Sequence, residues 1–113
     1  MNFTIEKVKI FVSVPKENVK EIRDAICKLD VGIIGNYSCC TSSVSSLGTF
    51  KPNEKAHPYI GSLNTLECVE EELLSFLCHI DKVKKVLTEL RKVHPYEEPA
   101  IDIVPLIDEK YFK

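Results

Sequence analysis

The 113-residue sequence predicts an α+β sandwich in which an antiparallel sheet carries two helices on one face. Two observations lead to this fold class. Short segments alternate apolar and polar residues, as half-buried strands do, and two longer segments repeat apolar residues at helical spacing. The second half of the chain also repeats the pattern of the first, so that Val12 aligns with Phe76 and Ile22 aligns with Val86.

The first predicted strand and helix fill residues 7–29. The strand spans residues 7–14, because apolar residues alternate there and Pro15 follows. Its apolar face consists of Val8, Ile10, Val12 and Val14. Residues 16–29 show helical spacing, and Gly32 is a typical signal for the end of a helix.

The middle of the chain is predicted as a hairpin followed by a loop. Residues 35–44 form its first β-segment, residues 45–48 form the turn and residues 49–52 form a short return strand. Proline, glycine and asparagine mark residues 52–64 as a loop. The next strand covers residues 67–78, and we expect the acidic stretch at its start to be solvated.

A second helix at residues 80–93 and a last strand at residues 100–106 complete the predicted elements. The order strand, helix, strand, strand, helix, strand is the ferredoxin-like βαββαβ arrangement. Residues 1–113 therefore form a single domain, in which helices cover one face of the sheet. The other face, or an edge strand, would need a partner, so we expect the chain to form oligomers.

Composition and charge exclude several classes of function. Fifteen basic and seventeen acidic residues give a net charge of -2, and the basic residues form no cluster with aromatic residues. We therefore expect no nucleic-acid partner. No apolar run approaches the roughly 18 residues of a spanning helix, and the start of the chain lacks a signal-peptide pattern. We expect no membrane partner and a cytoplasmic location.

Five cysteines are present, an odd number without a CxxC pair. This pattern argues against a disulfide framework and against a structural zinc site. We expect Cys27 and Cys78 to be buried as small apolar groups. Only the adjacent residues Cys39 and Cys40 then invite chemistry.

Residues 94–99, His-Pro-Tyr-Glu-Glu-Pro, place an imidazole, a phenol and two carboxylates between two prolines. One interpretation is structural, because proline ends a helix and leads into a strand. The other interpretation is a ligand or metal site, in which a carboxylate orients His94 or completes a set of ligands. The sequence alone leaves both interpretations open.

Two further segments are candidates for a site. Residues 35–43 include Asn36, Tyr37 and Cys40, and a thiol with an imidazole could hold Cu(I) or Zn(II). Because neighbouring side chains on a strand point to opposite faces, at most one of the two thiols would serve one site. Alternatively, the segment is the solvated face of a strand.

The His-Pro-Tyr tripeptide at residues 57–59 repeats the tripeptide at residues 94–96, either by chance or as part of a loop site. His79 is expected to cap the second helix or lie on the surface.

Catalysis has little support in the sequence. There is no nucleophile elbow, phosphate-binding glycine loop or HExxH motif, and the side chains of Glu97 and Glu98 would diverge in an extended chain. We therefore predict a binding or regulatory module and not an enzyme. An enzyme with a nucleophilic Cys40 assisted by His94 is a further alternative.

Four motifs in order resemble a known family: Gly35-Asn36-Tyr37-x-x-Cys40, Gly48-Thr49-Phe50-x-Pro52, Pro58-Tyr59-Ile60-Gly61 and His94-Pro95-Tyr96-Glu97-Glu98-Pro99-Ala100-x-Asp102. They resemble the PII/CutA-like domain inserted in bacterial Nif-three-like proteins and its stand-alone relatives. The last motif is also similar to the tail of the CutA divalent-cation-tolerance proteins. The resemblance implies a ferredoxin-like subunit and a homotrimer. It also implies that the dinuclear metal centre of full-length relatives lies in a surrounding domain, so a hydrolase activity does not transfer to this chain.

Together these observations predict a trimeric, non-catalytic protein that binds a small ligand or a metal near subunit clefts. The ligand-binding residues would be Asn36, Tyr37, Tyr96, Glu97 and Glu98, and Cys40, His94 and Glu98 would bind copper or zinc. We expect one sheet edge to bring these two segments together. The alternatives are a purely structural trimeric interaction module and a CutA-like copper tolerance protein.

Overall fold

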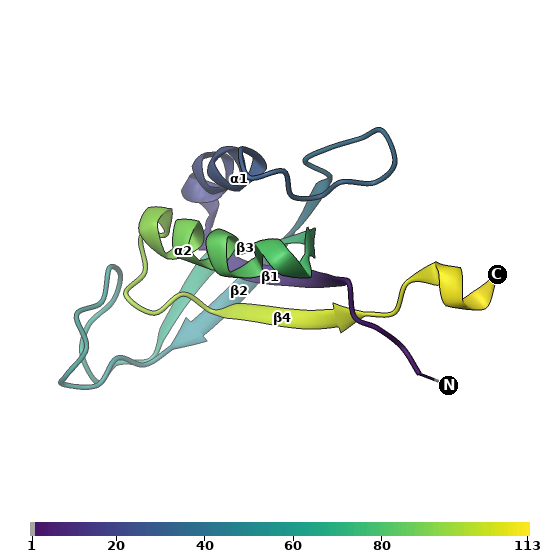
Figure 1. The fold of residues 1–113 in the computed structure, drawn as a ribbon. Coiled ribbons are helices and arrows are strands. Elements are labelled where there is room, and N and C mark those ends of the chain that lie inside the picture. Colours follow the sequence, from purple (N-terminus) through teal and green to yellow (C-terminus); the bar gives the residue numbers. More distant parts are fainter. Residues whose placement is uncertain (1) are drawn as a thin grey trace.

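The computed structural model describes residues 2–113, which form a four-stranded antiparallel sheet with two α-helices on one face (Figure 1). The elements are β1 (Lys7–Pro15), α1 (Val19–Cys27), β2 (Thr41–Phe50), β3 (Glu67–His79), α2 (Val83–Val93) and β4 (Ile101–Leu106). Short 3-10 helices precede α1 at Lys16–Asn18 and α2 at Ile80–Lys82, and a third follows β4 at Glu109–Phe112. The strand order is β2-β3-β1-β4. The predicted α+β, ferredoxin-like fold is confirmed.

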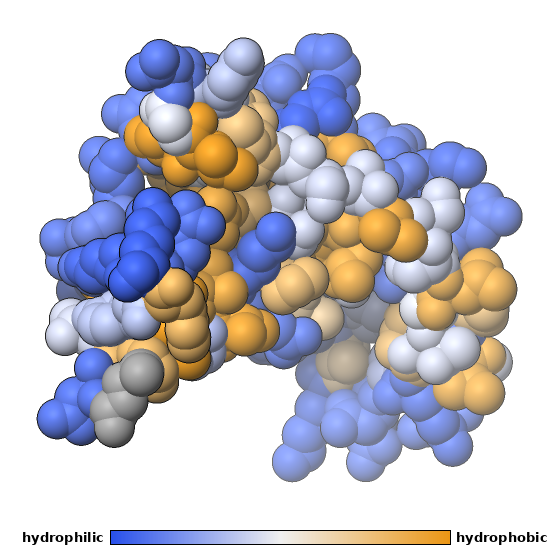
Figure 2. Space-filling model, turned by 90° about the vertical axis from the view of Figure 1, so that its right-hand side faces the viewer, coloured by the Kyte–Doolittle hydropathy of each residue, from blue (hydrophilic) through white to orange (hydrophobic). Residues whose placement is uncertain are grey.

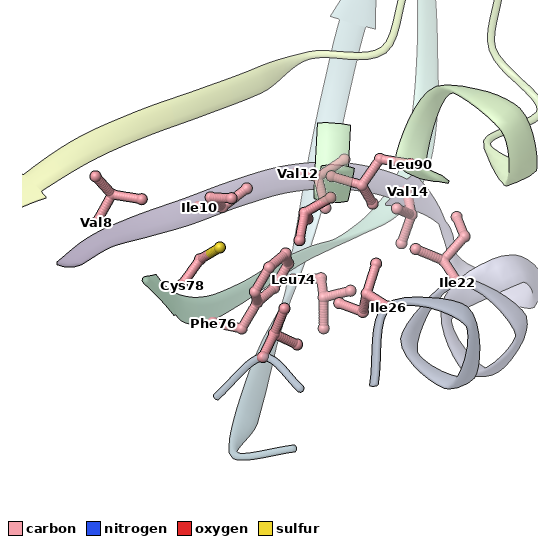
Figure 3. Close-up of a cluster of buried hydrophobic side chains, with 12 residues drawn as sticks. Val8, Ile10, Val12, Val14, Ile22, Ile26, Leu74, Phe76, Cys78 and Leu90 are labelled. Atoms are coloured by element: carbon pink, nitrogen blue, oxygen red, sulfur yellow. The ribbon is translucent and has the colours of Figure 1, made fainter. Parts of the chain in front are cut away.

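The core lies between the sheet and the helices. β1 is central and pairs with both β3 and β4, and the register places Ile10 opposite Phe76 and Val12 opposite Leu74. Alternate residues of β1 and β3 therefore point toward the helices, where Ile22 and Leu90 meet them (Figure 3). The buried apolar residues are Val8, Ile10, Val12, Val14, Ile22, Ile26, Val31, Leu74, Phe76, Cys78, Val86 and Leu90.

The predicted hairpin between residues 35 and 52 is wrong. β2 runs without a turn from Thr41 to Phe50, and every one of its residues pairs with β3. The expected turn at residues 45–48 lies inside this strand, where Gly48 faces Val69. The physical reason is the length of β3, whose 13 residues offer a continuous partner to a strand of weak intrinsic β preference.

The segment before β2 also differs from the prediction. Helix α1 ends at Cys27, and the chain reaches the sheet only at Thr41. Gly32 does not end the helix. It has a φ of +63°, its N–H donates to the Leu77 carbonyl at 2.7 Å, and a Cβ there would come within 2.6 Å of the Cys40 backbone. Glycine is needed at this position because two stretches of backbone pass close together.

The cysteine prediction is wrong for one pair. Cys27 and Cys39 form a disulfide, with their Cα atoms 5.2 Å apart. Cys27 is only half-buried, whereas Cys78 is buried in the core as predicted. The path of residues 28–38 brings the pair together, because it leaves the helix and returns beside its last turn. An odd number of cysteines does not reveal such a path.

Helix α2 follows the prediction more closely. His79 is exposed and caps the 3-10 helix at Ile80–Lys82, where its Nδ1 accepts a hydrogen bond from the Asp81 N–H at 3.3 Å, as predicted for a capping or surface residue. The first and last segments meet, since the rings of Phe3 and Tyr111 pack edge to face at 5.2 Å. Among residues 2–113, no helix is both long and apolar enough to cross a membrane.

Candidate functional site

A groove of ≈ 430 Å³ lies at the end of the sheet where β2 stops and β3 begins. Its floor is the face of the sheet that carries no helices, because Ser13, Gly48 and Glu71 occupy strand positions that alternate with the helix-facing ones. Two segments form its walls, the loop at residues 51–66 and the segment at residues 94–100. Its apolar lining includes Phe50, Pro52, Pro58, Tyr59, Ile60 and Ala100.

A buried carboxylate stands in this groove. Glu71 of β3 is only 8% exposed, and its Oε2 accepts a hydrogen bond from the Tyr96 hydroxyl at 2.7 Å. Gly48 leaves the space for this carboxylate, because a Cβ at that position would collide with Glu71 Oε1. Burial, and then the hydrogen bond to Glu71, raises the pKa of Tyr96, so the phenol remains a hydrogen-bond donor.

His94 holds the start of the second wall in place. Its Nε2 lies 2.8 Å from the Ser13 carbonyl, which can only accept, so Nε2 carries the proton and donates. Its Nδ1 accepts from the Tyr96 N–H at 3.1 Å. Burial lowers the pKa of His94 below its ordinary value of 6.5, which favours the neutral ring. Both nitrogens are occupied, so a metal ion could bind His94 only by displacing one of these hydrogen bonds.

The two His-Pro-Tyr tripeptides meet across the groove. Glu97 Oε1 accepts a hydrogen bond from the backbone N–H of His57 at 2.9 Å, and the rings of Tyr59 and Tyr96 lie 6.3 Å apart. Glu98 is exposed and reaches Arg91 only at 4.0 Å, a surface pair that stabilises little. Tyr96 and Glu97 are therefore built into the groove, and Glu98 lies at its rim.

Asn36, Tyr37 and Cys40 lie at the opposite end of the sheet. Their segment contacts β3 at Leu77, six residues from Glu71, which corresponds to about 20 Å along a strand. In Figure 1 the loop after α1 and the loop between β2 and β3 project from opposite ends of the molecule. The expected meeting of Cys40 with His94 does not occur within one chain, so neither the predicted metal set nor the alternative nucleophile and base assemble there. Within residues 2–113, no three His, Cys, Asp or Glu side chains cluster as metal ligands.

Sequence reasoning missed Glu71, Gly48 and Ser13. The acidic stretch was expected to be solvated, which is wrong for Glu71. The alternation of side chains along the strand could have pointed to Glu71. This residue shares its face of the sheet with Leu73 and Ser75, opposite the face of the buried Leu74 and Phe76. Gly48 was read as part of a turn, and Ser13 contributes only its backbone carbonyl to His94, which no side-chain pattern predicts.

Comparisons with known proteins show which structures share this fold. No protein-family model matches the chain. CutA1 structures from Oryza sativa and from Shewanella sp. SIB1 superpose with TM-scores of 0.69 and 0.72 at 18% and 16% identity. They cover 96% and 97% of this chain, which covers 88% and 92% of theirs. At such low identity these matches establish the fold alone, and the chain thus has the ferredoxin-like fold of the CutA structures.

Closer relatives identify the family. A Bacillus cereus protein related to NIF3 superposes with a TM-score of 0.80 at 36% sequence identity. The match covers 95% of this chain and 27% of the Bacillus cereus chain. The GTP cyclohydrolase 1 type 2 homolog of Halalkalibacterium halodurans is 42% identical over 101 residues, 89% of this chain and 27% of the relative. Its Bacillus subtilis counterpart is 41% identical over 98 residues, 87% of this chain and 26% of the relative. The chain belongs to the Nif3-like family through this domain, which spans about a quarter of the length of these relatives.

Proposed function

We propose that this domain is a non-catalytic, regulatory module that binds a small planar molecule in the groove. The observation that carries the proposal is the buried Glu71 carboxylate, held by the Tyr96 hydroxyl in a groove with aromatic walls. Pockets for small molecules combine apolar walls with a few fixed polar groups in this manner. Tyr59 and Tyr96 supply ring faces, and Glu71 supplies acceptor oxygens.

The charges of the groove define the chemistry of the ligand. Glu71, Glu97 and Glu98 line it together with a single lysine, Lys51. This excess of negative charge disfavours phosphates and favours neutral or cationic groups that donate hydrogen bonds. A planar ring with adjacent N–H donors, such as guanine, could pair with a carboxylate and pack against tyrosine. The relatives named GTP cyclohydrolase 1 type 2 homolog make guanosine a suitable first probe.

Calorimetric titration of the chain with guanosine tests this proposal, with adenosine as the comparison ligand. Guanosine should bind more tightly than adenosine, and Glu71→Gln should weaken guanosine binding about 10- to 100-fold, since a hydrogen bond to a charged group contributes about 1.5–3 kcal/mol. Glu70→Gln is the matched control, because Glu70 is the exposed neighbour of Glu71 on β3 and does not line the groove. The proposal is wrong if the parent binds neither guanosine nor the guanidinium compound agmatine, or if Glu71→Gln binds as tightly as the parent.

A second proposal concerns assembly, for which the helix-free face of the sheet is the supporting observation. Half-buried Phe11, Leu73 and Leu77 lie on this face, and Val44 and Val104 on the edge strands are 62% and 43% exposed. An apolar sheet face with open edges favours association. We propose that copies of the chain pack through this face into a closed homo-oligomer, a trimer by the resemblance noted above.

Light scattering after size-exclusion chromatography measures the assembly directly. The parent should elute with three times the 12.8 kDa mass of one chain, and Val104→Lys should shift it toward the monomer. Leu66→Lys is the control, because Leu66 is 70% exposed but precedes β3 in the loop. A parent that is monomeric at every concentration tested contradicts the proposal.

A further inference from the structure

A disulfide closes the loop at the end of the sheet opposite the groove. Cys27 is the last residue of α1, and Cys39 lies two residues before β2. Both residues are half-buried, in contrast to Cys78, which is 2% exposed and belongs to the core. A third cysteine, Cys40, is a free, half-buried thiol next to Cys39 in sequence. The crosslink therefore lies at the rim of the core, within reach of small thiols.

The loop keeps backbone contacts that do not depend on the crosslink. The Cys39 N–H donates to the Val31 carbonyl at 3.0 Å, and the Cys40 N–H donates to the Gly32 carbonyl at 2.9 Å. Gly32 in turn donates to Leu77 of the sheet. These bonds join the base of the loop to the domain, so breaking the disulfide leaves the sheet and its core in place. Two folded states, crosslinked and open, are thus compatible with this architecture.

The residues between the two limbs form the exposed tip of the loop. Tyr37 and Ile34 exchange backbone hydrogen bonds at 2.9 Å at the tip, and their side chains are 74% and 54% exposed. Ile33 is also 47% exposed. Figure 2 shows the molecule from the right-hand side of Figure 1, where this loop and the chain termini lie. On this face, hydrophobic residues (orange) lie among hydrophilic ones (blue). Because little of this apolar tip is buried, few side-chain contacts of its own oppose local opening.

We propose that the Cys27–Cys39 disulfide is a thiol–disulfide exchange site that accepts electrons from dithiols and controls the order of residues 33–38. A thiolate of the dithiol attacks one sulfur of the disulfide and expels the other as a thiolate. The second thiol of the dithiol then displaces the protein sulfur from the mixed disulfide. Two electrons and two protons pass to Cys27 and Cys39, and the dithiol leaves as its own disulfide. Oxidation by a disulfide reverses the sequence.

The test uses the 113-residue chain in native buffer with dithiothreitol as the probe dithiol. Alkylation and mass spectrometry should show two additional reactive thiols after mild reduction, while thermal unfolding remains cooperative. Hydrogen exchange of the amides at residues 33–38 should accelerate at least 10-fold, and oxidised dithiothreitol should restore the slow rate. Chemical reduction of the parent makes the test independent of whether a cysteine variant folds.

Two variants sharpen the result. Cys39→Ser should exchange at residues 33–38 as fast as the reduced parent, with or without dithiothreitol. Cys68→Ser is the matched control, because Cys68 is an exposed free cysteine at the start of β3, and it should behave as the parent does. The proposal is overturned if the disulfide is reduced only in denaturant, if it does not form under oxidising conditions, or if reduction leaves hydrogen exchange at residues 33–38 unchanged.

Discussion

The two ends of the sheet hold their flanking segments by different means. At the groove end, side chains make the connections, with Tyr96 bonded to Glu71 and His94 bonded to the Ser13 carbonyl. At the opposite end, backbone hydrogen bonds join Gly32 to the sheet, and the Cys27–Cys39 disulfide closes the loop. One end thus depends on polar side chains in a groove, and the other depends on backbone and covalent structure.

Because of this difference, we expect the groove end to respond to ligands and the disulfide end to respond to changes in the backbone. A buried hydrogen bond between side chains contributes about 0.5–3 kcal/mol and responds to protonation or to a competing ligand. A close approach of two backbone segments cannot adjust in this way, because neither segment has a rotamer to change. We therefore expect substitutions at the disulfide end to reduce stability most, and substitutions at the groove end to act on stability and on binding together.

The largest effect is expected for Gly32→Ala. The new Cβ would lie 2.6 Å from the backbone N and O of Cys40, and the positive φ of +63° adds strain. We expect a loss of about 3–4 kcal/mol in the free energy of unfolding, measured by urea denaturation. Gly35→Ala is the matched control, since its φ is +57° with no atom within 4 Å of the new Cβ. It should lose only about 1 kcal/mol, and equal losses would show that backbone contact is unimportant.

Removal of the disulfide should have the next largest effect. In the chain-entropy view, a crosslink between residues 12 apart in sequence restricts the unfolded chain by about 3 kcal/mol. The double variant Cys27→Ser/Cys39→Ser should lower the urea midpoint accordingly and keep a single cooperative transition. The parent measured in reducing buffer provides the comparison. If the double variant and the reduced parent both match the oxidised parent, the disulfide contributes no stability.

The sequence predicted most elements because their periodicity depends on local pattern. Alternation gave β1, and helical spacing gave α1 and α2. The hairpin at residues 35–52 failed because strand β2 is rich in serine and contains Gly48, which favour turns when considered without a partner. Its extended form depends on ten pairs with β3, and such pairing between distant segments cannot be seen in a local window.

The candidate site was predictable in one half only. The segment at residues 94–99 contains concentrated titratable groups, so the sequence directed attention to His94 and Tyr96. From the sequence we also expected residues 94–99 to lie beside residues 35–40. The structure places residues 35–40 at the other end of the sheet. Glu71 escaped notice because it is one of three consecutive glutamates, and only the strand register distinguishes it from Glu70 and Glu72. The Cys27–Cys39 contact likewise depends on a loop path that residue spacing does not encode.

Gly48→Ala should destabilise the groove end less than Gly32→Ala affects the other end. Its Cβ meets the end of the Glu71 side chain, which can move by giving up the Tyr96 hydrogen bond. We expect a loss of about 1–2 kcal/mol in the free energy of unfolding. The same substitution in a Glu71→Ala background should cost much less, because the colliding atom is absent. A double-variant cycle without such coupling would contradict this account.

The smallest effect is expected from the titration of His94. Burial lowers its pKa in the folded chain below the ordinary value of 6.5, so the unfolded chain takes up the proton first as pH falls. The stability that His94 contributes is complete above about pH 6.5 and is lost as pH falls through that value toward the pKa of the folded chain. Thermal unfolding between pH 8 and pH 5 should show this decline in the parent.

His94→Gln should flatten the decline in stability, because the amide can donate to the Ser13 carbonyl without titrating. His57→Gln, a change at an exposed side chain, should retain the decline, and a parent without any decline in this range would show that His94 titrates alike in both states.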